Sequence, residues 1–341
     1  MPFLPTIEPT TGHADRSAYG ILGGCIAGGV TSVDDVLRVG DLDWEVETHP
    51  FASTITTPGE VIITEQGVTT PEPTTQVVGP KNKHLVVRRN PDGTRQALEA
   101  VVHKDYPPIQ HRQIVELGQA LVDSSDVSWS AAGHYRGGLK NFLQLDFPEG
   151  ILIGGRDAVD LSLVLFGGHD GRSSVLGVPT ATRLACSNQF PALQHSEVRF
   201  SIQHRGNVAI KLAEVRAAIG LTFRAAEEVK AIGDQLIAAP ITSKEFLSFV
   251  DVIYPLARDK DGDITGQSRN RQAAVRAIYE TEADQASIHG TRWGALQAVI
   301  AYEDWHAATR GDSETAHARR IVAHTADPIK QRATDLLLSG V

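Results

Sequence analysis

The sequence predicts an α+β protein with a central, mostly antiparallel sheet, accompanying helices and a helical C-terminal third. Two patterns give this prediction. Between residues 81 and 203, short runs of alternating apolar and polar residues are separated by turn-forming residues, as is typical of antiparallel strands. After residue 207 the apolar residues recur at helical spacing. Strands and helices do not alternate along the chain as they do in parallel α/β folds.

The first 76 residues are predicted to contain few regular elements. Residues 31–34 have the sequence of a helix start and precede a short apolar stripe. Residues 42–46 follow as a candidate strand. Residues 54–75 are rich in Thr, Pro, Gly and Glu, so we expect a loop or extended strands there, together with an internal boundary.

Two hairpins, one helix and further strands are expected in the centre of the chain. Residues 81–103 form the first hairpin, because residues 90–93 (Asn-Pro-Asp-Gly) have turn chemistry. Residues 110–123 place apolar side chains at helical spacing. Residues 127–147 form the second hairpin around Arg136-Gly137-Gly138. Further strands are predicted at residues 161–166, 175–185 and 197–203.

The remainder is predicted to be helical. Asn207 caps a helix that ends at Gly220, and Thr222 caps a second helix that continues to residue 236. Further helices are predicted at residues 244–254, 272–282, 291–308 and 313–338. The chain therefore divides into an acidic N-terminal section (residues 1–76), an α+β core (77–240) and a helical C-terminal section (241–341).

Composition is that of a globular protein, with 41% apolar and 21% charged residues. We find no secretory signal and no run approaching the ~20 apolar residues that span a bilayer. We therefore expect a cytoplasmic protein without a membrane partner. Two cysteines, Cys25 and Cys186, are too few for a disulfide framework or a multi-thiolate metal site.

The net charge of −9 is unevenly distributed. Residues 1–76 contain eleven acids and two bases, whereas residues 77–224 contain thirteen acids and seventeen bases. Residues 225–341 contain seventeen acids and thirteen bases. A mildly basic centre that an acidic N-terminal section masks is compatible with a nucleic-acid partner.

Motifs for cofactor-driven chemistry are absent from the sequence. There is no phosphate loop and no dinucleotide-binding glycine motif. Residues 259–263 have the acidic character of a calcium loop, but Ile264 and Asn270 stand where the loop needs Gly and Glu. We expect no cofactor. The sequence leaves open whether the protein is an enzyme and favours a non-enzymatic function.

A polar turn follows the buried strand at residues 161–166. His169 and Asp170 lie on this glycine-rich turn, where they could bind a metal, act as acid and base, or stabilise the fold and bind a partner. Asn188 and His204 are the further members of this candidate polar site, reached through the fold. A nucleophile at Cys186 has no local support.

Basic residues form the second candidate site. If the second hairpin and the strand at 197–203 share a sheet, basic side chains from both line one groove and contact phosphates. Tyr135 adds a surface for base stacking. The alternative is a half-solvated sheet face with scattered bases. The candidate phosphate contacts are Arg136, Lys140, Arg183, Arg199, Arg205 and Lys211.

Three ordered motifs resemble a known family. They are Gly-Gly-His-Asp-Gly-Arg-Ser-Ser (167–174), Val-Pro-Thr-Ala-Thr-Arg-Leu-Ala-Cys-Ser-Asn-Gln-Phe (178–190) and Ile-Gln-His-Arg-Gly-Asn (202–207). Residues 130–138 and 290–306 add supporting matches. Together they resemble the phage/plasmid-like protein family, a domain of unknown function. The resemblance implies a gene of phages, prophages or plasmids that acts in a bacterial cytoplasm, and it supplies no activity.

The order helix, hairpin, further strands, helix is similar to the core of Rad52-like single-strand annealing proteins. This analogy implies an oligomer such as a ring, which binds DNA in a basic groove without hydrolysing ATP. We therefore expect a homo-oligomeric protein that binds and anneals single-stranded DNA during recombination or replication of a phage or plasmid. One alternative is a metal-dependent nuclease or hydrolase centred on His169 and Asp170. Another is an acidic interaction protein that counters host defence, with residues 1–76 mimicking DNA charge.

Overall fold

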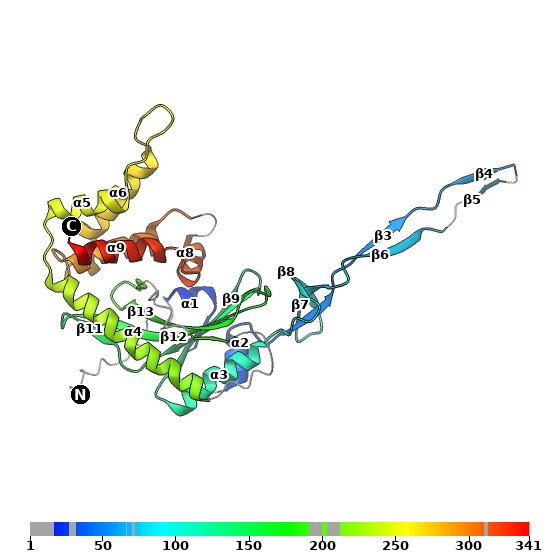
Figure 1. Cartoon of the computed structure of the whole chain (residues 1–341), viewed down its shortest axis with the longest axis horizontal. Coiled ribbons are helices and arrows are strands. Elements are labelled where there is room, and N and C mark those ends of the chain that lie inside the picture. The colour runs from blue at the N-terminus through cyan, green and yellow to red at the C-terminus, as the bar shows by residue number, and fades with distance from the viewer. Residues whose placement is uncertain are drawn as a thin grey trace.

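The computed structural model describes residues 17–26, 32–65, 67–69, 72–190, 200–202, 212–309 and 313–340. Strands account for 29% and helices for 40% of the structure, and the last third is helical. The predicted α+β class is therefore confirmed. A central sheet lies between two groups of helices, and a long two-stranded ribbon projects from one end of the molecule (Figure 1).

The central sheet is antiparallel, in the order β1-β9-β10-β12-β13-β14, with β11 paired to β12. Leu143 pairs with Leu165, and Leu163 pairs with Pro179, so the apolar positions of neighbouring strands share one face. The second predicted hairpin and the strand at 161–166 are confirmed. The strands are β1 (Gly24–Cys25), β9 (Ser128–Tyr135), β10 (Lys140–Asp146), β11 (Ile151–Ile153), β12 (Asp157–Gly168), β13 (Val175–Arg183) and β14 (Phe200–Ile202).

Helices cover both faces of this sheet (Figure 1). On one face lie α3 (His111–Ser124) and α4 (Leu212–Ala238), which share the main apolar core with the sheet. On the other face α1 (Ala18–Leu22) and α8 (Ser313–Val322) pack against Phe142. Segments from both ends of the chain therefore complete the central layer, and the first residues described are part of the core.

Helix α4 corrects one prediction. The chain runs through Gly220 and Thr222 as one helix instead of ending and restarting there. A glycine ends a helix when it adopts a left-handed conformation, and Gly220 keeps the helical backbone. Beyond it, Ala225, Ala226 and Val229 are buried, so packing favours continuation. The predicted cap Asn207 lies outside the described residues.

The C-terminal helices join the same core as the sheet, because Trp293 stacks on Phe190 with ring centroids 5.8 Å apart. The prediction of one helix at 313–338 is wrong: Pro328 has no amide hydrogen to continue a helix, and it begins a new one. Among the helices described, none is long and apolar enough to cross a membrane. The C-terminal helices are α5 (Ser243–Ile253), α6 (Gly266–Thr281), α7 (Arg292–Ala301), α8 and α9 (Asp327–Ser339), with short helical turns at Ala283–Gln285 and Tyr302–His306.

A second, three-stranded sheet leads into the projecting ribbon (Figure 1). The first predicted hairpin is confirmed within it, and of the loop or extended strands predicted at residues 54–75 the structure has extended strands. The boundary predicted after residue 76 falls inside β6. The three-stranded sheet comprises β2 (Glu45–Pro50), β7 (Lys83–Arg89) and β8 (Arg95–His103), and it follows α2 (Val33–Val39). The ribbon comprises β3 (Ser53–Thr57), β4 (Ile62–Thr64), β5 (Gly67–Thr69) and β6 (Thr74–Val78).

Two helix glycines should respond oppositely to alanine. A Cβ at Gly118 of α3 would lie 2.2 Å from the ring of Trp129, so Gly118→Ala should lower the free energy of unfolding by ~1–3 kcal/mol. A Cβ at Gly220 meets open space, so Gly220→Ala should raise it by ~0.5–1 kcal/mol. Urea unfolding measures both. Loss of stability in Gly220→Ala would contradict a continuous α4.

Candidate functional site

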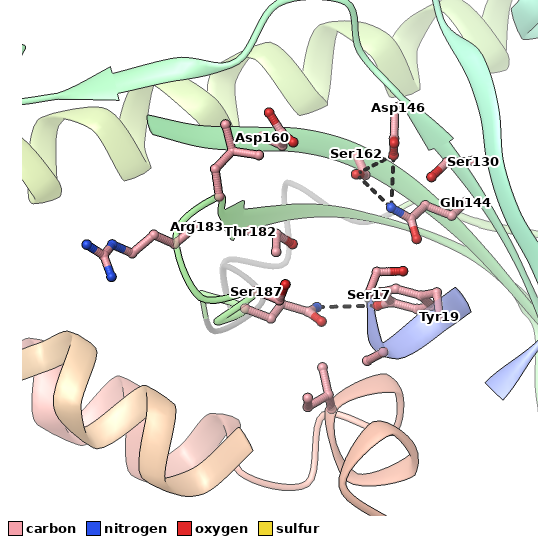
Figure 2. Close-up of a pocket in the computed structure, with 14 residues that line it drawn as sticks. Ser17, Tyr19, Ser130, Gln144, Asp146, Asp160, Ser162, Thr182, Arg183 and Ser187 are labelled. Atoms are coloured by element: carbon pink, nitrogen blue, oxygen red, sulfur yellow. Dashed lines mark hydrogen bonds between the residues drawn. The ribbon is translucent and has the colours of Figure 1, made fainter. Parts of the chain in front are cut away.

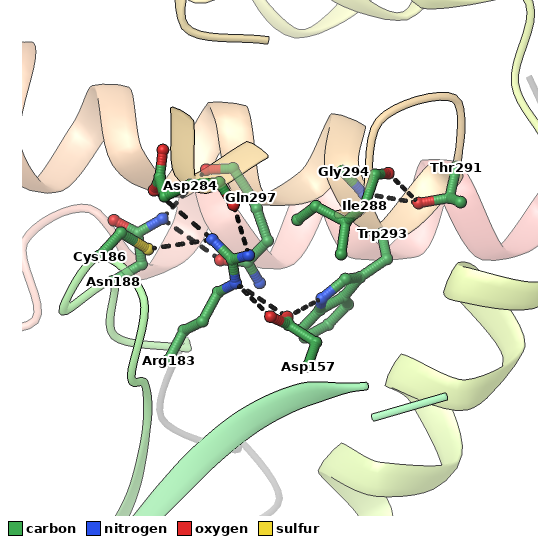
Figure 3. Close-up of polar contacts among 10 residues, drawn as sticks. All are labelled: Asp157, Arg183, Cys186, Asn188, Asp284, Ile288, Thr291, Trp293, Gly294 and Gln297. Atoms are coloured by element: carbon green, nitrogen blue, oxygen red, sulfur yellow. Dashed lines mark hydrogen bonds and ion pairs between the residues drawn. The ribbon is translucent and has the colours of Figure 1, made fainter. Parts of the chain in front are cut away.

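Arg183 does not line an open groove, which corrects its predicted role. It stands at the end of β13 with only 2% of its surface exposed. Its Nε donates to both carboxylate oxygens of Asp157, at 2.9 and 2.8 Å, and its Nη2 donates to the carbonyl of Asp284 at 2.7 Å (Figure 3). The indole Nε1 of Trp293 donates to the same Asp157 at 2.6 Å. The guanidinium is thus enclosed by protein and cannot reach a phosphate.

The same cluster contains Asn188 and Cys186 (Figure 3). Asn188 Nδ2 lies 3.3 Å from the side-chain and main-chain oxygens of Gln297. Burial raises the pKa of Cys186 to about 12, so its thiol stays protonated and is a poor nucleophile. The motif at 178–190 and the segment at 290–306 therefore meet in one buried network. This network joins the sheet to α7, and Asn188 lies in it, apart from His169.

Of the remaining predicted contacts, Tyr135, Arg136 and Lys140 lie together at the β9–β10 turn, where Lys140 pairs with Tyr135 across the two strands. Arg136 is exposed on the β9–β10 turn. Lys140 donates to Asp170 Oδ2 at 2.7 Å and also to the hydroxyl of Ser173. Tyr135 is half-buried, and burial raises its pKa. Because Arg183 is buried and Arg199 is not among the described residues, the described chain shows only the hairpin side of the predicted groove. Arg199, Arg205, Lys211 and His204 lie outside the described residues.

His169 lies in a buried histidine pair. Its Nε2 is 2.9 Å from Nε2 of His111, and His111 Nδ1 is 3.1 Å from the carbonyl of Leu42. If His111 Nδ1 donates to that carbonyl, His111 Nε2 accepts from His169. The ring of Trp44 packs edge to face with the ring of His111, and their centroids are 4.2 Å apart. Burial lowers the pKa of His111 to about 4.

The histidine pair lacks the surroundings of a metal centre. Across the described segments, no group of three His, Cys, Asp or Glu side chains is arranged to hold a metal ion. Asp170 turns towards Lys140 instead of the histidines. The three described members of the predicted polar site, His169, Asp170 and Asn188, thus occupy three different environments.

The acidic N-terminal section and the basic centre of the chain neutralise each other. Carboxylates on α2 and β2 and in the segment between them pair with arginines on α3, β7 and β8. Counting charges along the sequence could not reveal this, because the partners are 44 to 78 residues apart. Four of the eleven acids of residues 1–76 are therefore paired with arginines of the centre. The pairs are Asp34 with Arg112, Asp41 with Arg88, Glu45 with Arg89, and Glu47 with Arg95.

A small polar cavity lies between the sheet and α1 (Figure 2). Asp146 Oδ1 accepts from Ser162 Oγ at 2.7 Å and from Gln144 Nε2 at 2.9 Å. Burial raises the pKa of Asp146. The cavity volume is about 50 Å³, which suits one or two water molecules better than a substrate. The guanidinium of Arg183 points away from it (Figure 2). Sequence analysis missed it, although the Ser162 position alternates with leucines in β12.

A larger groove lies where the three-stranded sheet meets the turn after β12. Its volume is about 660 Å³, within the usual range of ligand sites. The turn is rigid because Asp170 Oδ1 accepts from the amides of Arg172 and Ser173, at 3.0 and 2.8 Å. Gly171 takes the left-handed conformation (φ 72°) that this turn requires. The residues that line the groove include Lys83, Val101, His103, Tyr106, Pro107 and Arg172.

The charge of this groove is positive, because its carboxylates are already neutralised. Although partial burial opposes the shift, the Lys140 ammonium and backbone amides hold the pKa of Asp170 well below its usual range. Asp105 pairs with Lys104 at 3.0 Å. Within the described residues, Lys83 and Arg172 make no ion pair, which leaves two uncommitted cations. We take this groove as the candidate site.

Removing the buried guanidinium of Arg183 should strongly destabilise the fold. Arg183→Met leaves Asp157 charged and buried, so we expect the free energy of unfolding to fall by ~3–5 kcal/mol. The double variant with Asp157→Asn should recover part of that loss because the orphaned charge is gone. Arg136→Ala, at an exposed position, should change stability by less than ~0.5 kcal/mol. Equal stability of Arg183→Met and the parent chain would refute the structural role.

Stability should fall in mild acid because His111 is held neutral. Its pKa drops from 6.5 to about 4 on folding, so the unfolded chain binds the proton first. The stabilisation that neutral His111 contributes is complete above pH 6.5 and is lost as pH falls towards 4. The free energy of unfolding should fall by up to ~3 kcal/mol over this range. His111→Asn keeps a donor for Leu42 and should flatten this slope in unfolding measurements. An unchanged slope in His111→Asn, matching exposed His289→Asn, would contradict the assignment.

Comparison with known families gives one match. The family model for DUF932, a domain of unknown function, matches residues 99–323, which include α3, the central strands and most of the C-terminal helices. No curated protein and no solved structure gives a significant match. The matched region contains the buried Arg183 network and the loop side of the groove. The chain therefore belongs to the DUF932 family, whose name carries no function.

Proposed function

We propose that the protein binds single-stranded DNA and anneals it during recombination or replication of a phage or plasmid. The strand lies in the groove between β8 and the turn at residues 170–174. The observation that carries the proposal is the pair of uncommitted cations, Lys83 and Arg172, facing one groove whose carboxylates are neutralised. Such cations hold phosphates at any base sequence.

The apolar side of the groove supports a single strand. Half-buried Tyr106 and exposed Val101 line the same groove and give it an apolar surface beside the cations. The hydroxyl of Tyr106 is neutral and does not repel phosphate, and burial raises its pKa further, to about 12. A base can stack or pack on such a wall whatever its identity, because every base has a π face.

The chain order supports annealing as the outcome of binding. Helix α3, strands β9, β10, β12 and β13, and helix α4 follow one another in the order expected of a Rad52-like core. The resemblance of residues 167–207 to proteins of mobile elements agrees with that role. A homo-oligomer remains part of the proposal. A hydrolase centred on His169 receives no support, because Asp170 and Asn188 point to other partners.

Charge reversal in the groove tests the proposal. Lys83→Glu with Arg172→Glu should weaken binding to a labelled single-stranded oligonucleotide by about ten-fold or more at low salt, since two phosphate contacts become repulsive. Mobility shift measures the affinity. Lys244→Glu with Lys260→Glu, the same charge change at two exposed positions, should leave it unchanged. If the groove variant binds as tightly as the parent chain, the strand does not lie in this groove.

A further inference from the structure

The ribbon formed by residues 51–80, here called the arm, has no partner within the described chain. Its two strand pairs stand clear of the body (Figure 1), and neither belongs to a larger sheet. An isolated two-stranded ribbon is at best marginally stable in water. Apolar side chains nevertheless project from it, the most exposed at 77%. They are Phe51, Ile55, Val61, Ile63, Val68, Val77 and Val78.

The charge of the arm limits what can cover it. Residues 51–80 contain Glu60, Glu65 and Glu72 and no Lys, Arg or His. Two arms laid tip to tip would bring like charges together, which disfavours pairing of one tip with another. A nucleic-acid strand would be repelled as well. The arm therefore needs a partner surface that is apolar and positively charged.

The groove has that character. Lys83 and Arg172 supply positive charge, and Val101, which is 43% exposed, adds an apolar wall with Tyr106. At the end of the arm, Ile63 pairs directly across the ribbon with Val68, and carboxylates lie close by along the chain. An apolar pair flanked by acids thus matches an apolar wall flanked by bases.

The arm cannot fill the groove of its own chain. Lys83 begins β7, directly after the arm, so the groove lies at the arm's base. The strands of the arm carry its tip roughly 50 Å away, at ~3.3 Å per residue. Figure 1 shows the ribbon running outward from the three-stranded sheet. An arm tip that occupies this groove must therefore belong to another molecule.

We infer that the arm tip of one copy docks in the groove of a second copy. In a two-fold pair each tip enters the other groove, so both contacts form at once. The association does not depend on DNA. Its consequence does rest on the proposed function: a docked tip and a DNA strand compete for Lys83 and Arg172, so DNA displaces the arm from the groove.

Sedimentation velocity of the full chain at low salt, without DNA, tests the association. The parent chain should form a dimer or larger oligomer that dissociates as salt is raised. Ile63→Asp with Val68→Asp should weaken association at least about ten-fold, whereas Val252→Asp, at an exposed apolar position of α5, should not. A parent chain that stays monomeric at every concentration, or a tip variant that associates equally well, overturns the inference.

A charge exchange between two chains identifies the contact. Lys83→Glu/Arg172→Glu and Glu60→Lys/Glu65→Lys should each be monomeric alone, because tip and groove then carry the same sign. Mixed together they should associate, since each tip meets a groove of opposite charge. Absence of a mixed species overturns the inference. The tip variant should bind DNA at least as tightly as the parent. If association behaves as described but no variant binds DNA, only the proposed function fails.

Discussion

The rest of the structure depends on one buried guanidinium. Arg183 is held by Asp157 of β12 and by the carbonyl of Asp284, and Trp293 of α7 shares the same carboxylate. A buried charge without such partners would cost several kcal/mol, so the sheet and the helical layer must stay together. The chain is therefore one continuous core, although its helices follow its strands in sequence. Arg183 and Asn188 of the motif at 178–190 are therefore structural.

Charge pairing between distant segments decides which surface remains available. Arginines of β7, β8 and α3 are neutralised by carboxylates on α2 and β2 and in the segment that joins them, and Lys140 is neutralised by Asp170. The groove keeps the charge of Lys83 and Arg172, and the arm keeps that of its glutamates. Opposite charges on separate parts of one chain are what the proposed DNA binding and the inferred self-association both require, and under these proposals the two compete.

Local patterns predicted much of the fold, because hairpins and capped helices are specified by neighbouring residues. The turn at residues 90–93 and the spacing in α3 are examples. The predicted helix end at Gly220 was wrong because the packing of α4 on the sheet sets the conformation of this residue. The site was less predictable. Arg183 looked like a surface base because its partner Asp284 is 101 residues away, and Lys83 approaches Arg172 only through the fold.

The most direct test of the central claim, that two free cations hold a DNA strand in the groove, is the salt dependence of binding. Fluorescence anisotropy with a labelled single-stranded oligonucleotide gives the association constant over a salt series. Two phosphate contacts predict that its logarithm falls against log salt with a slope of about −1 to −2. A slope near zero, or no binding at the lowest salt, would contradict the claim.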